Sequence, residues 1–215
     1  MGGSGNKPRH LALEAFDPAP AVRVGRDILE GAGVPYALAG RLAVWAWVPA
    51  DEQEFTKDVD FAVPQEHMPA VEEALAKRGM RAVPLPIGGV AVRDGDVRLD
   101  FIDRRVDFGE LYTEAVAAAH ESGSTASTPD GLEVPVVPAE YVAAMKIATG
   151  DPRDERDVER LAVQPHFDYQ ACRRIVRHHV GPGSANRLDH VCSRVGLEAA
   201  ARYVRESNGG GADGT

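Results

Sequence analysis

Short apolar runs in the first two thirds of the chain alternate between the two-residue period of a strand and the 3.6-residue period of a helix. Gly, Pro and Asp residues separate the runs, as turn residues do. Strands are predicted over residues 34–40, 56–63, 81–85, 89–92, 97–103 and 132–137. Helices are predicted over residues 22–31, 65–78 and 110–120, a helix or turn over 41–48, and a polar loop over 122–130. The alternation favours an α/β or α+β core.

From Pro138 onward the pattern is helical, with a break at Gly181-Pro182-Gly183. Residues 1–20 begin with a segment that lacks a signal-peptide core and are expected to form a flexible leader. Residues 208–215 are glycine-rich and have nothing to bury, so we expect a disordered tail. The sequence therefore predicts a core over residues 21–137 and a C-terminal helical part over residues 138–207.

Two acids, Asp58 and Asp60, lie two residues apart in the predicted strand 56–63. Acids with this spacing extend from the same face of a strand. Two carboxylates that lie so close together repel each other unless a metal ion or a proton is shared between them. Their hard oxygen atoms favour magnesium or calcium over zinc. The pair is therefore a candidate cation site, and the alternative is an exposed strand face or a helix N-cap.

A third acid, Asp100, lies in the predicted strand 97–103, which the turn signal Asp94-Gly95 joins to the run 89–92 in a hairpin. On this strand Arg98, Asp100 and Ile102 share one face, and Leu99 and Phe101 share the other. Asp100 therefore joins the first two acids if the two strands are neighbours. Asp103 points the opposite way, and we expect it to be a turn or cap residue at the strand end.

The predicted strand 34–40 ends in Gly40, and Arg41 follows it at the start of the next apolar segment. Glycine lets a phosphate approach the backbone, and the free N–H groups and positive dipole end of a helix attract anions. A single glycine after an apolar run is usually just a turn. A strand–Gly–helix junction followed by Asp-x-Asp and a later strand Asp is much more specific for phosphate chemistry.

Together these segments resemble the nucleotidyltransferase superfamily typified by DNA polymerase beta. The resemblance is greatest to its small bacterial branch, which includes minimal nucleotidyltransferases and the toxins of type IV toxin–antitoxin systems. It covers residues 34–162 and rests on Leu38-Ala39-Gly40-Arg41-Leu42-Ala43, Thr56-Lys57-Asp58-Val59-Asp60-Phe61, Arg98-Leu99-Asp100-Phe101, and Val137-Pro138-Ala139-Glu140-Tyr141-Val142-Ala143-Ala144-Met145-Lys146 with Arg153-Asp154-Glu155-Arg156-Asp157.

The resemblance implies a mixed β-sheet flanked by helices and the transfer of a nucleoside monophosphate from a nucleoside triphosphate to an acceptor. It also implies two magnesium ions, with manganese as the alternative. The catalytic and metal-binding residues would be Asp58, Asp60 and Asp100. Asp100, near the acceptor's metal, would help to activate the acceptor hydroxyl.

Three further residues are candidates for nucleotide contact, namely Gly40, Arg41 and Lys146. Arg41 departs from the family pattern, in which Ser or Gly usually follows the glycine, and Glu54 stands where relatives often have Arg. Lys146 lies at the border of a buried helical stripe, from which it would reach a phosphate or extend into solvent. Asp154 is expected to cap the following helix and is left out of the site.

Composition fits a modest enzyme without a membrane anchor. With 215 residues and 44% hydrophobic content, the chain is long enough for one domain with an appended helical part or for two small domains. No apolar stretch approaches the roughly 18 residues of a membrane span, and the first ten residues lack a signal-peptide core. Two cysteines, Cys172 and Cys192, do not make a disulfide scaffold, so a reducing cytoplasm is the default.

The net charge of -9 disfavours broad nonspecific binding of nucleic acid, although arginines outnumber acids in the predicted C-terminal helices. Histidines His178, His179 and His190 and the two cysteines also suggest a zinc site. Adjacent histidines on a helix point about 100° apart, and no Cys-x-x-Cys pair is present, so no zinc is expected.

The sequence therefore predicts a magnesium-dependent nucleotidyltransferase whose substrates are a nucleoside triphosphate, ATP included, and an acceptor hydroxyl. A tRNA end, a Ser or Tyr of a partner protein, and a small aminoglycoside-like molecule would all suit this chemistry. The alternative is a catalytically idle nucleotidyltransferase-like protein that serves as a binding or regulatory partner. Arg41 and Glu54 are the residues that favour the alternative.

Overall fold

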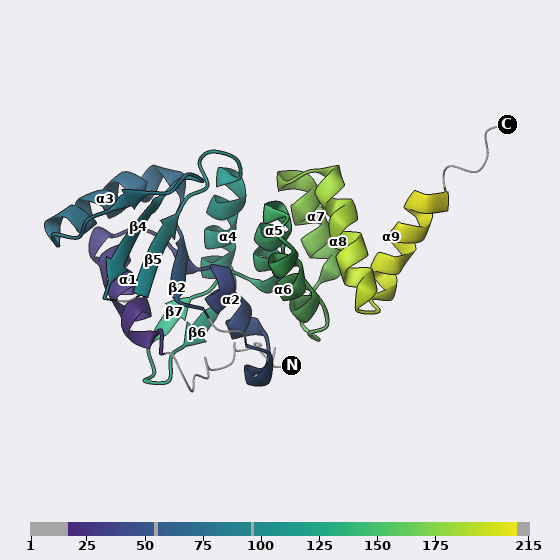
Figure 1. The fold of residues 1–215 in the computed structure, drawn as a ribbon, viewed down its shortest axis with the longest axis horizontal. Coiled ribbons are helices and arrows are strands. Elements are labelled where there is room, and N and C mark those ends of the chain that lie inside the picture. Colours follow the sequence, from purple (N-terminus) through teal and green to yellow (C-terminus); the bar gives the residue numbers. More distant parts are fainter. Residues whose placement is uncertain (1–16, 54–55, 96, 210–215) are drawn as a thin grey trace. The chain divides into compact units, whose positions relative to one another are not determined.

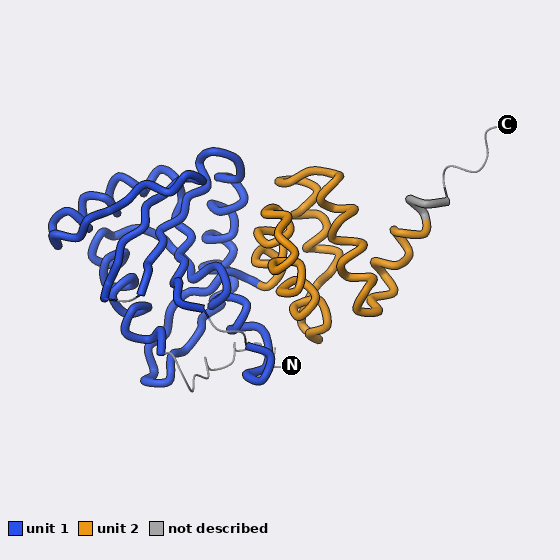
Figure 2. Tube along the Cα trace, viewed as in Figure 1, with its two compact units in different colours: residues 1–138 blue, residues 139–215 orange. Residues whose placement is uncertain are grey.

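The structure is a computed structural model that describes residues 17–53, 56–95 and 97–209. The chain divides into two compact units, residues 1–138 and 139–215 (Figure 1 and Figure 2). Over the residues described, the helices are too short or too polar to span a membrane. Glu54 lies outside the described residues.

Unit 1 is built around a five-stranded mixed sheet with the strand order β1-β2-β5-β4-β3. Strands β2 and β5 run parallel, and the other neighbouring pairs run antiparallel. The strands are β1 Ala37–Leu38, β2 Asp58–Ala62, β3 Val83–Pro84, β4 Val90–Asp94 and β5 Val97–Ile102. The predicted mixed sheet and the hairpin of β4 and β5 are confirmed.

Helices flank this sheet, as the resemblance implies (Figure 1). Helix α1 packs closely on one face, where a Cβ on Gly25 would collide with the ring of Phe61. Phe61 in turn stacks on Phe101, with ring centroids 5.9 Å apart. Each large apolar side chain buried this way contributes about 1.5–3 kcal/mol. The helices of unit 1 are α1 Ala19–Ala32, α2 Gly40–Trp47, α3 Met68–Lys77 and α4 Gly109–Ser122, with short 3-10 helices over Ala50–Glu52 and Gln65–His67.

The prediction of a polar loop over 122–130 is wrong. Strand β6, Thr125–Ser127, pairs antiparallel with β7, Glu133–Pro135, in a second small sheet. Only the middle residue of β6, Ala126, is buried, so its polar neighbours hide the strand in the sequence pattern. The turn between the strands is closed by the Leu132 backbone N–H, which donates to the Thr128 hydroxyl at 3.0 Å.

Helices at both ends of the described chain extend into the segments predicted as leader and tail. Ala19 and Pro20 already belong to α1, because proline fits the first turn of a helix, where its missing N–H has no partner to lose. The Ala19 N–H donates to the Asp17 carboxylate at 2.9 Å. At the other end, Asn208 and Gly209 belong to the last helix of the chain.

Unit 2 is helical from Ala139, and Gly181 provides the left-handed turn (φ 109°) that precedes Pro182 at the start of α8. A buried acid joins its last three helices. Asp189 of α8 accepts hydrogen bonds from the Tyr169 hydroxyl at 2.5 Å and from two nitrogens of Arg173 at 2.9 and 3.0 Å. The Arg173 guanidinium lies over the Tyr203 ring of α9, 3.7 Å from its centre. The helices are α5 Ala139–Thr149, α6 Pro152–Ala162, α7 Tyr169–His179, α8 Pro182–Arg194 and α9 Glu198–Gly209.

We predict that Asp189→Ala lowers the free energy of unfolding by about 3–5 kcal/mol, because it leaves the guanidinium of Arg173 without its partner in a poorly solvated place. Urea unfolding followed by circular dichroism measures this loss. Arg194→Ala is the matched control, since Arg194 pairs with Glu155 and Glu159 while half exposed. It should cost only about 0–1 kcal/mol. Equal losses in the two variants would contradict the role given to Asp189.

Candidate active site

The three predicted acids lie on two neighbouring parallel strands. In the register of β2 and β5, Asp60 is the direct partner of Asp100, and Asp58 is the direct partner of Arg98. Directly paired residues extend from the same face of a sheet, and neighbouring strands lie about 4.8 Å apart. The structure therefore brings Asp58, Asp60 and Asp100 together on one face, with Arg98 among them.

The opposite face of the same two strands fixes this arrangement. Val59, Phe61, Leu99 and Phe101 are fully buried there. A register slip of one residue would turn these side chains toward solvent and the acids toward the core. The hydrophobic core therefore determines which side chains meet at the site.

The three acids differ in exposure: Asp58 is exposed, Asp60 is half-buried and Asp100 is buried. Burial raises the pKa of Asp100, the hydrogen bond from Arg98 opposes this rise, and the charge of Asp58 adds to it. Arg98 Nε donates to Asp100 Oδ1 at 2.7 Å. That hydrogen bond raises the pKa of Arg98, and the charges of all three acids add to the rise. The four side chains therefore form one electrostatic cluster.

The strand–Gly–helix junction lies beside this cluster. Gly40 opens α2 with φ of 58°, and the N–H of the preceding Ala39 donates to the backbone oxygen of Asp60 at 2.8 Å. A Cβ on Gly40 would overlap the Asp60 carboxylate and lie only 2.7 Å from its Cγ. Any other residue here would displace Asp60, so glycine meets both a conformational and a steric requirement. Arg41 follows, half-buried, in the first turn of α2.

We predict that Gly40→Ala both destabilises the protein and displaces Asp60. Gly33→Ala is the matched control, because Gly33 also has positive φ (66°) but nothing within 4 Å of its added Cβ. In the control, the free energy of unfolding should fall by only about 1–2 kcal/mol, the cost of a left-handed conformation for a residue with a Cβ. In Gly40→Ala the free energy of unfolding should fall further, and binding of magnesium, measured by calorimetry, should weaken. Equal unfolding free energies and unchanged metal binding would show that Gly40 does not pack on the acid.

Asp103 lies outside the cluster, as expected. Its side chain is fully buried, and Oδ1 accepts from the Arg105 backbone N–H at 3.1 Å. Its other oxygen pairs with the Arg105 guanidinium at 2.6 Å. The expected turn role of Asp103 is therefore confirmed.

Lys146 lies on α5, in unit 2, and is engaged by two acids of α6. Its Nζ is 2.6 Å from Asp154 Oδ1 and 3.0 Å from Asp157 Oδ2. Burial lowers the pKa of Lys146, but the two carboxylates outweigh burial and raise it. The assignment of Asp154 as the cap of α6 is wrong: the carboxylate of Asp151 accepts from the Arg153 N–H at 2.7 Å, because it directly precedes Pro152 at the start of the helix. The phosphate contact of Lys146 stays a prediction.

Arg98 is a residue of the cluster that was not predicted as part of the site. Its signal is its position two residues before Asp100, which places a cation on the same face of a strand as the acid. The spacing of the acids predicts only that they need a cation from outside the chain. The structure shows that the chain supplies one positive charge of its own.

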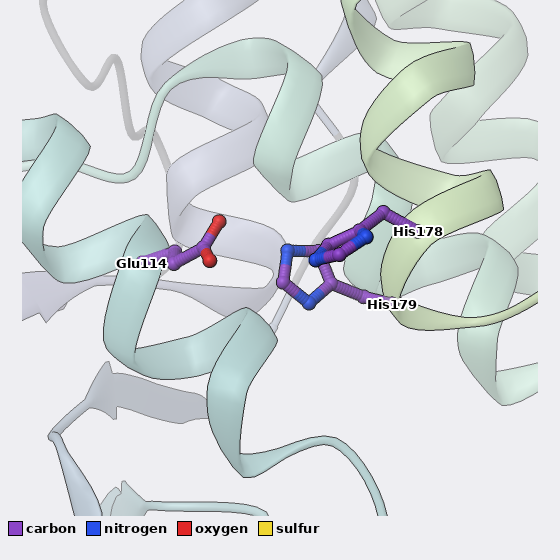
Figure 3. Close-up of side chains that lie close together, drawn as sticks. All are labelled: Glu114, His178 and His179. Atoms are coloured by element: carbon purple, nitrogen blue, oxygen red, sulfur yellow. The ribbon is translucent and has the colours of Figure 1, made fainter.

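The cysteines of unit 2 are buried in its core, and two of its histidines lie at the end of α7. Cys172 and Cys192 are buried and unpaired, and burial raises the pKa of the Cys192 thiol to about 12. His178 and His179 end α7, with ring centroids 4.6 Å apart and planes at 79° (Figure 3). Figure 3 also draws Glu114, which belongs to α4 of unit 1. Basic side chains in the last turn of a helix complement the negative end of its dipole.

Comparison with known proteins finds similar solved structures at low sequence identity. The antibiotic-resistance factor ANT(2'')-Ia in solution is 16% identical, with a TM-score of 0.43 over 89% of this chain and 100% of that chain. An antigenic nucleotidyltransferase-like protein from Paracoccidioides brasiliensis is 16% identical, with a TM-score of 0.47 over 84% of this chain and 94% of that chain. A tRNA nucleotidyltransferase complexed with a primer tRNA and an ATP analogue is 16% identical, with a TM-score of 0.38 over 85% and 61%.

Neither a family model nor a curated protein matches the sequence significantly. The chain is thus similar to nucleotidyltransferases of known structure. Because the identities are low, the roles of its residues are argued from the chain itself.

Proposed function

We propose that this protein is a metal-dependent nucleotidyltransferase that transfers a nucleoside monophosphate from a nucleoside triphosphate to an acceptor hydroxyl. The observation that carries the proposal is the register that pairs Asp60 with Asp100 and places Asp58 on the same face. The motif resemblance of residues 34–162 supports it. The unpaired, buried Cys172 and Cys192 support a cytoplasmic location.

The donor set suits a hard divalent cation. The acids Asp58, Asp60 and Asp100 offer carboxylate oxygens, the ligands that magnesium and manganese prefer. Their three negative charges exceed the single positive charge of Arg98. Asp58 is exposed and Asp60 half-buried, so both can be reached from solvent. We infer that the three acids would hold two such ions, which when bound neutralise charge on the phosphates and on the leaving pyrophosphate.

The proposed transfer forms a bond between the acceptor oxygen and the α-phosphorus of the triphosphate and breaks the bond from that phosphorus to the leaving pyrophosphate. The hydroxyl proton must leave the acceptor during this exchange. Asp100 is the candidate proton acceptor, because it is the direct strand partner of Asp60 and lies on the side of the cluster next to β4. Release of Asp100 by Arg98 would precede both proton transfer and metal binding.

The triphosphate would lie against the start of α2. Gly40 lets the Asp60 carboxylate pack against the backbone at the start of α2, and the first N–H groups of a helix attract phosphate. Arg41, in the same turn, adds a guanidinium whose planar donors suit a phosphate. Lys146 is the remaining candidate, and its contacts with Asp154 and Asp157 would have to loosen for its ammonium to meet a phosphate.

A second candidate function is an idle binding or regulatory protein with the same fold. The ion pair of Arg98 with Asp100 favours it, because a guanidinium 2.7 Å from the carboxylate takes the place that a metal ion would need. The two functions differ in one property. An active enzyme must bind nucleotide in a metal-dependent manner, and an idle scaffold need not.

Calorimetry with magnesium and each of the four nucleoside triphosphates tests the proposal. We predict metal-dependent binding that Asp58→Asn and Asp60→Asn each weaken by at least about 10–100-fold, a loss that changes outside the ligand shell already produce at metal sites. Asp100→Asn should reduce turnover more than nucleotide binding, because charge develops on the acceptor side only in the transition state.

Asp94→Asn is the matched control, since Asp94 is an exposed acid of the same hairpin. It should bind metal and nucleotide like the parent protein. Binding that needs no metal, or that survives each substitution in the cluster, would contradict the proposed function and favour the idle scaffold.

A further inference from the structure

A second feature of unit 1 lies on the same face of the sheet as the acids. It is a hollow of about 470 Å³ over strands β3, β4 and β5, within the size range of small-molecule sites. The register defines its position. Asp60, Asp100, Ala91 and Val83 are successive partners across four strands, and the last two of them line the hollow.

A second row of paired residues, next to the first, consists of charged side chains and extends from the acids to the hollow. Asp58 pairs with Arg98 on β5, and Arg98 pairs with Arg93 on β4. Both arginines line the hollow, and Arg81 joins them from the segment before β3. Arg93 is two strand spacings, roughly 10 Å, from Asp58 along this row. The hollow therefore begins where the cluster of acids ends.

The lining has an unusual chemical composition for an acidic protein. The described residues that line the hollow include the three arginines and no acid, although the whole chain has a net charge of -9. Arg81 and Arg93 are exposed, and neither pairs with an acid among the described residues. Val83 contributes an apolar surface that is 54% exposed. Such a surface suits a ligand with a negative group and an apolar body.

The strand order separates this hollow from the start of α2. Helix α2 follows β1 at one edge of the sheet, and β3 forms the other edge, with the acids on the strands between them. A triphosphate beside Gly40 would thus approach the acids from one side. The acceptor would approach from the β4 side, next to Asp100.

We propose that the hollow binds the acceptor through a phosphate group, so that the acceptor of the proposed reaction is a phosphate-bearing molecule. This inference rests on the proposed function. Arg81 and Arg93 would contact the phosphate, and Val83 and Ala91 would contact the apolar part of the ligand. A polycation such as an aminoglycoside meets the exposed guanidinium groups of Arg81 and Arg93 at this site and is disfavoured by charge repulsion. The end of a nucleic-acid strand and a phosphorylated small molecule share the required chemistry.

Equilibrium binding without metal tests the hollow separately from the acids. The probes are a three-nucleotide single-stranded RNA, ribose 5-phosphate and the aminoglycoside tobramycin, each in EDTA. Arg81→Glu and Arg93→Glu should each weaken RNA binding about tenfold and lower the slope of log affinity against log salt by about 0.7, the loss of one phosphate contact on a single strand.

Lys77→Glu is the matched control, because Lys77 is an exposed cation of α3 and its replacement changes the net charge equally. It should leave both the affinity and the salt slope unchanged. Circular dichroism confirms that each variant is folded. Tighter binding of RNA than of ribose 5-phosphate assigns the site to a nucleic-acid end, and equal binding assigns it to a small phosphorylated acceptor.

Two results would overturn the inference: salt slopes of the arginine variants that match the Lys77→Glu control, or tobramycin binding tighter than both phosphate probes. These failures are distinct from failure of the proposed function. Loss of the hollow leaves metal-dependent binding of triphosphate at the acids intact. Failure of the acids leaves phosphate binding to Arg81 and Arg93 measurable in EDTA.

Discussion

The parallel pairing of β2 with β5 is the constraint on which the rest of unit 1 depends. It sends Val59, Phe61, Leu99 and Phe101 into the core and the acids to the other face. Each buried apolar side chain contributes about 1.5–3 kcal/mol, and each carboxylate forced into the core would cost several kcal/mol. Both terms oppose a one-residue slip of the strands. Burial of the apolar side chains therefore fixes the register even though it holds the three acids close together.

That repulsion remains the distinctive property of the site. Asp100 is buried beside Asp58 and Asp60, and Arg98 offsets only part of their charge. The cluster is therefore ready to accept more positive charge. On the same face of the sheet, the charge of the side chains changes from negative, at the acids of β2 and β5, to positive, at the arginines around β4. In the proposed reaction, the acids would bind the metal ions that accompany the triphosphate, and the arginines would bind the phosphate of the acceptor.

Sequence spacing was sufficient to predict the strands around the acids and their common face, because Asp58, Asp60 and Asp100 alternate with apolar residues that must be buried. It could not give the partner of each acid, since pairing is a property of strands far apart in the chain. Arg98 and the hollow were missed for that reason: Arg81, Arg93 and Arg98 come together only through the order of β3, β4 and β5. Strand β6 was missed because a three-residue strand with one buried side chain has no measurable period.

We propose that Asp58, Asp60 and Asp100 hold metal ions once Arg98 releases Asp100. Anomalous diffraction from crystals grown with manganese and a non-hydrolysable nucleoside triphosphate tests it most directly. We expect manganese peaks in contact with all three carboxylates and a guanidinium of Arg98 that no longer bonds Asp100. Manganese bound elsewhere, or triphosphate bound while Arg98 keeps its 2.7 Å contact with Asp100, would contradict it.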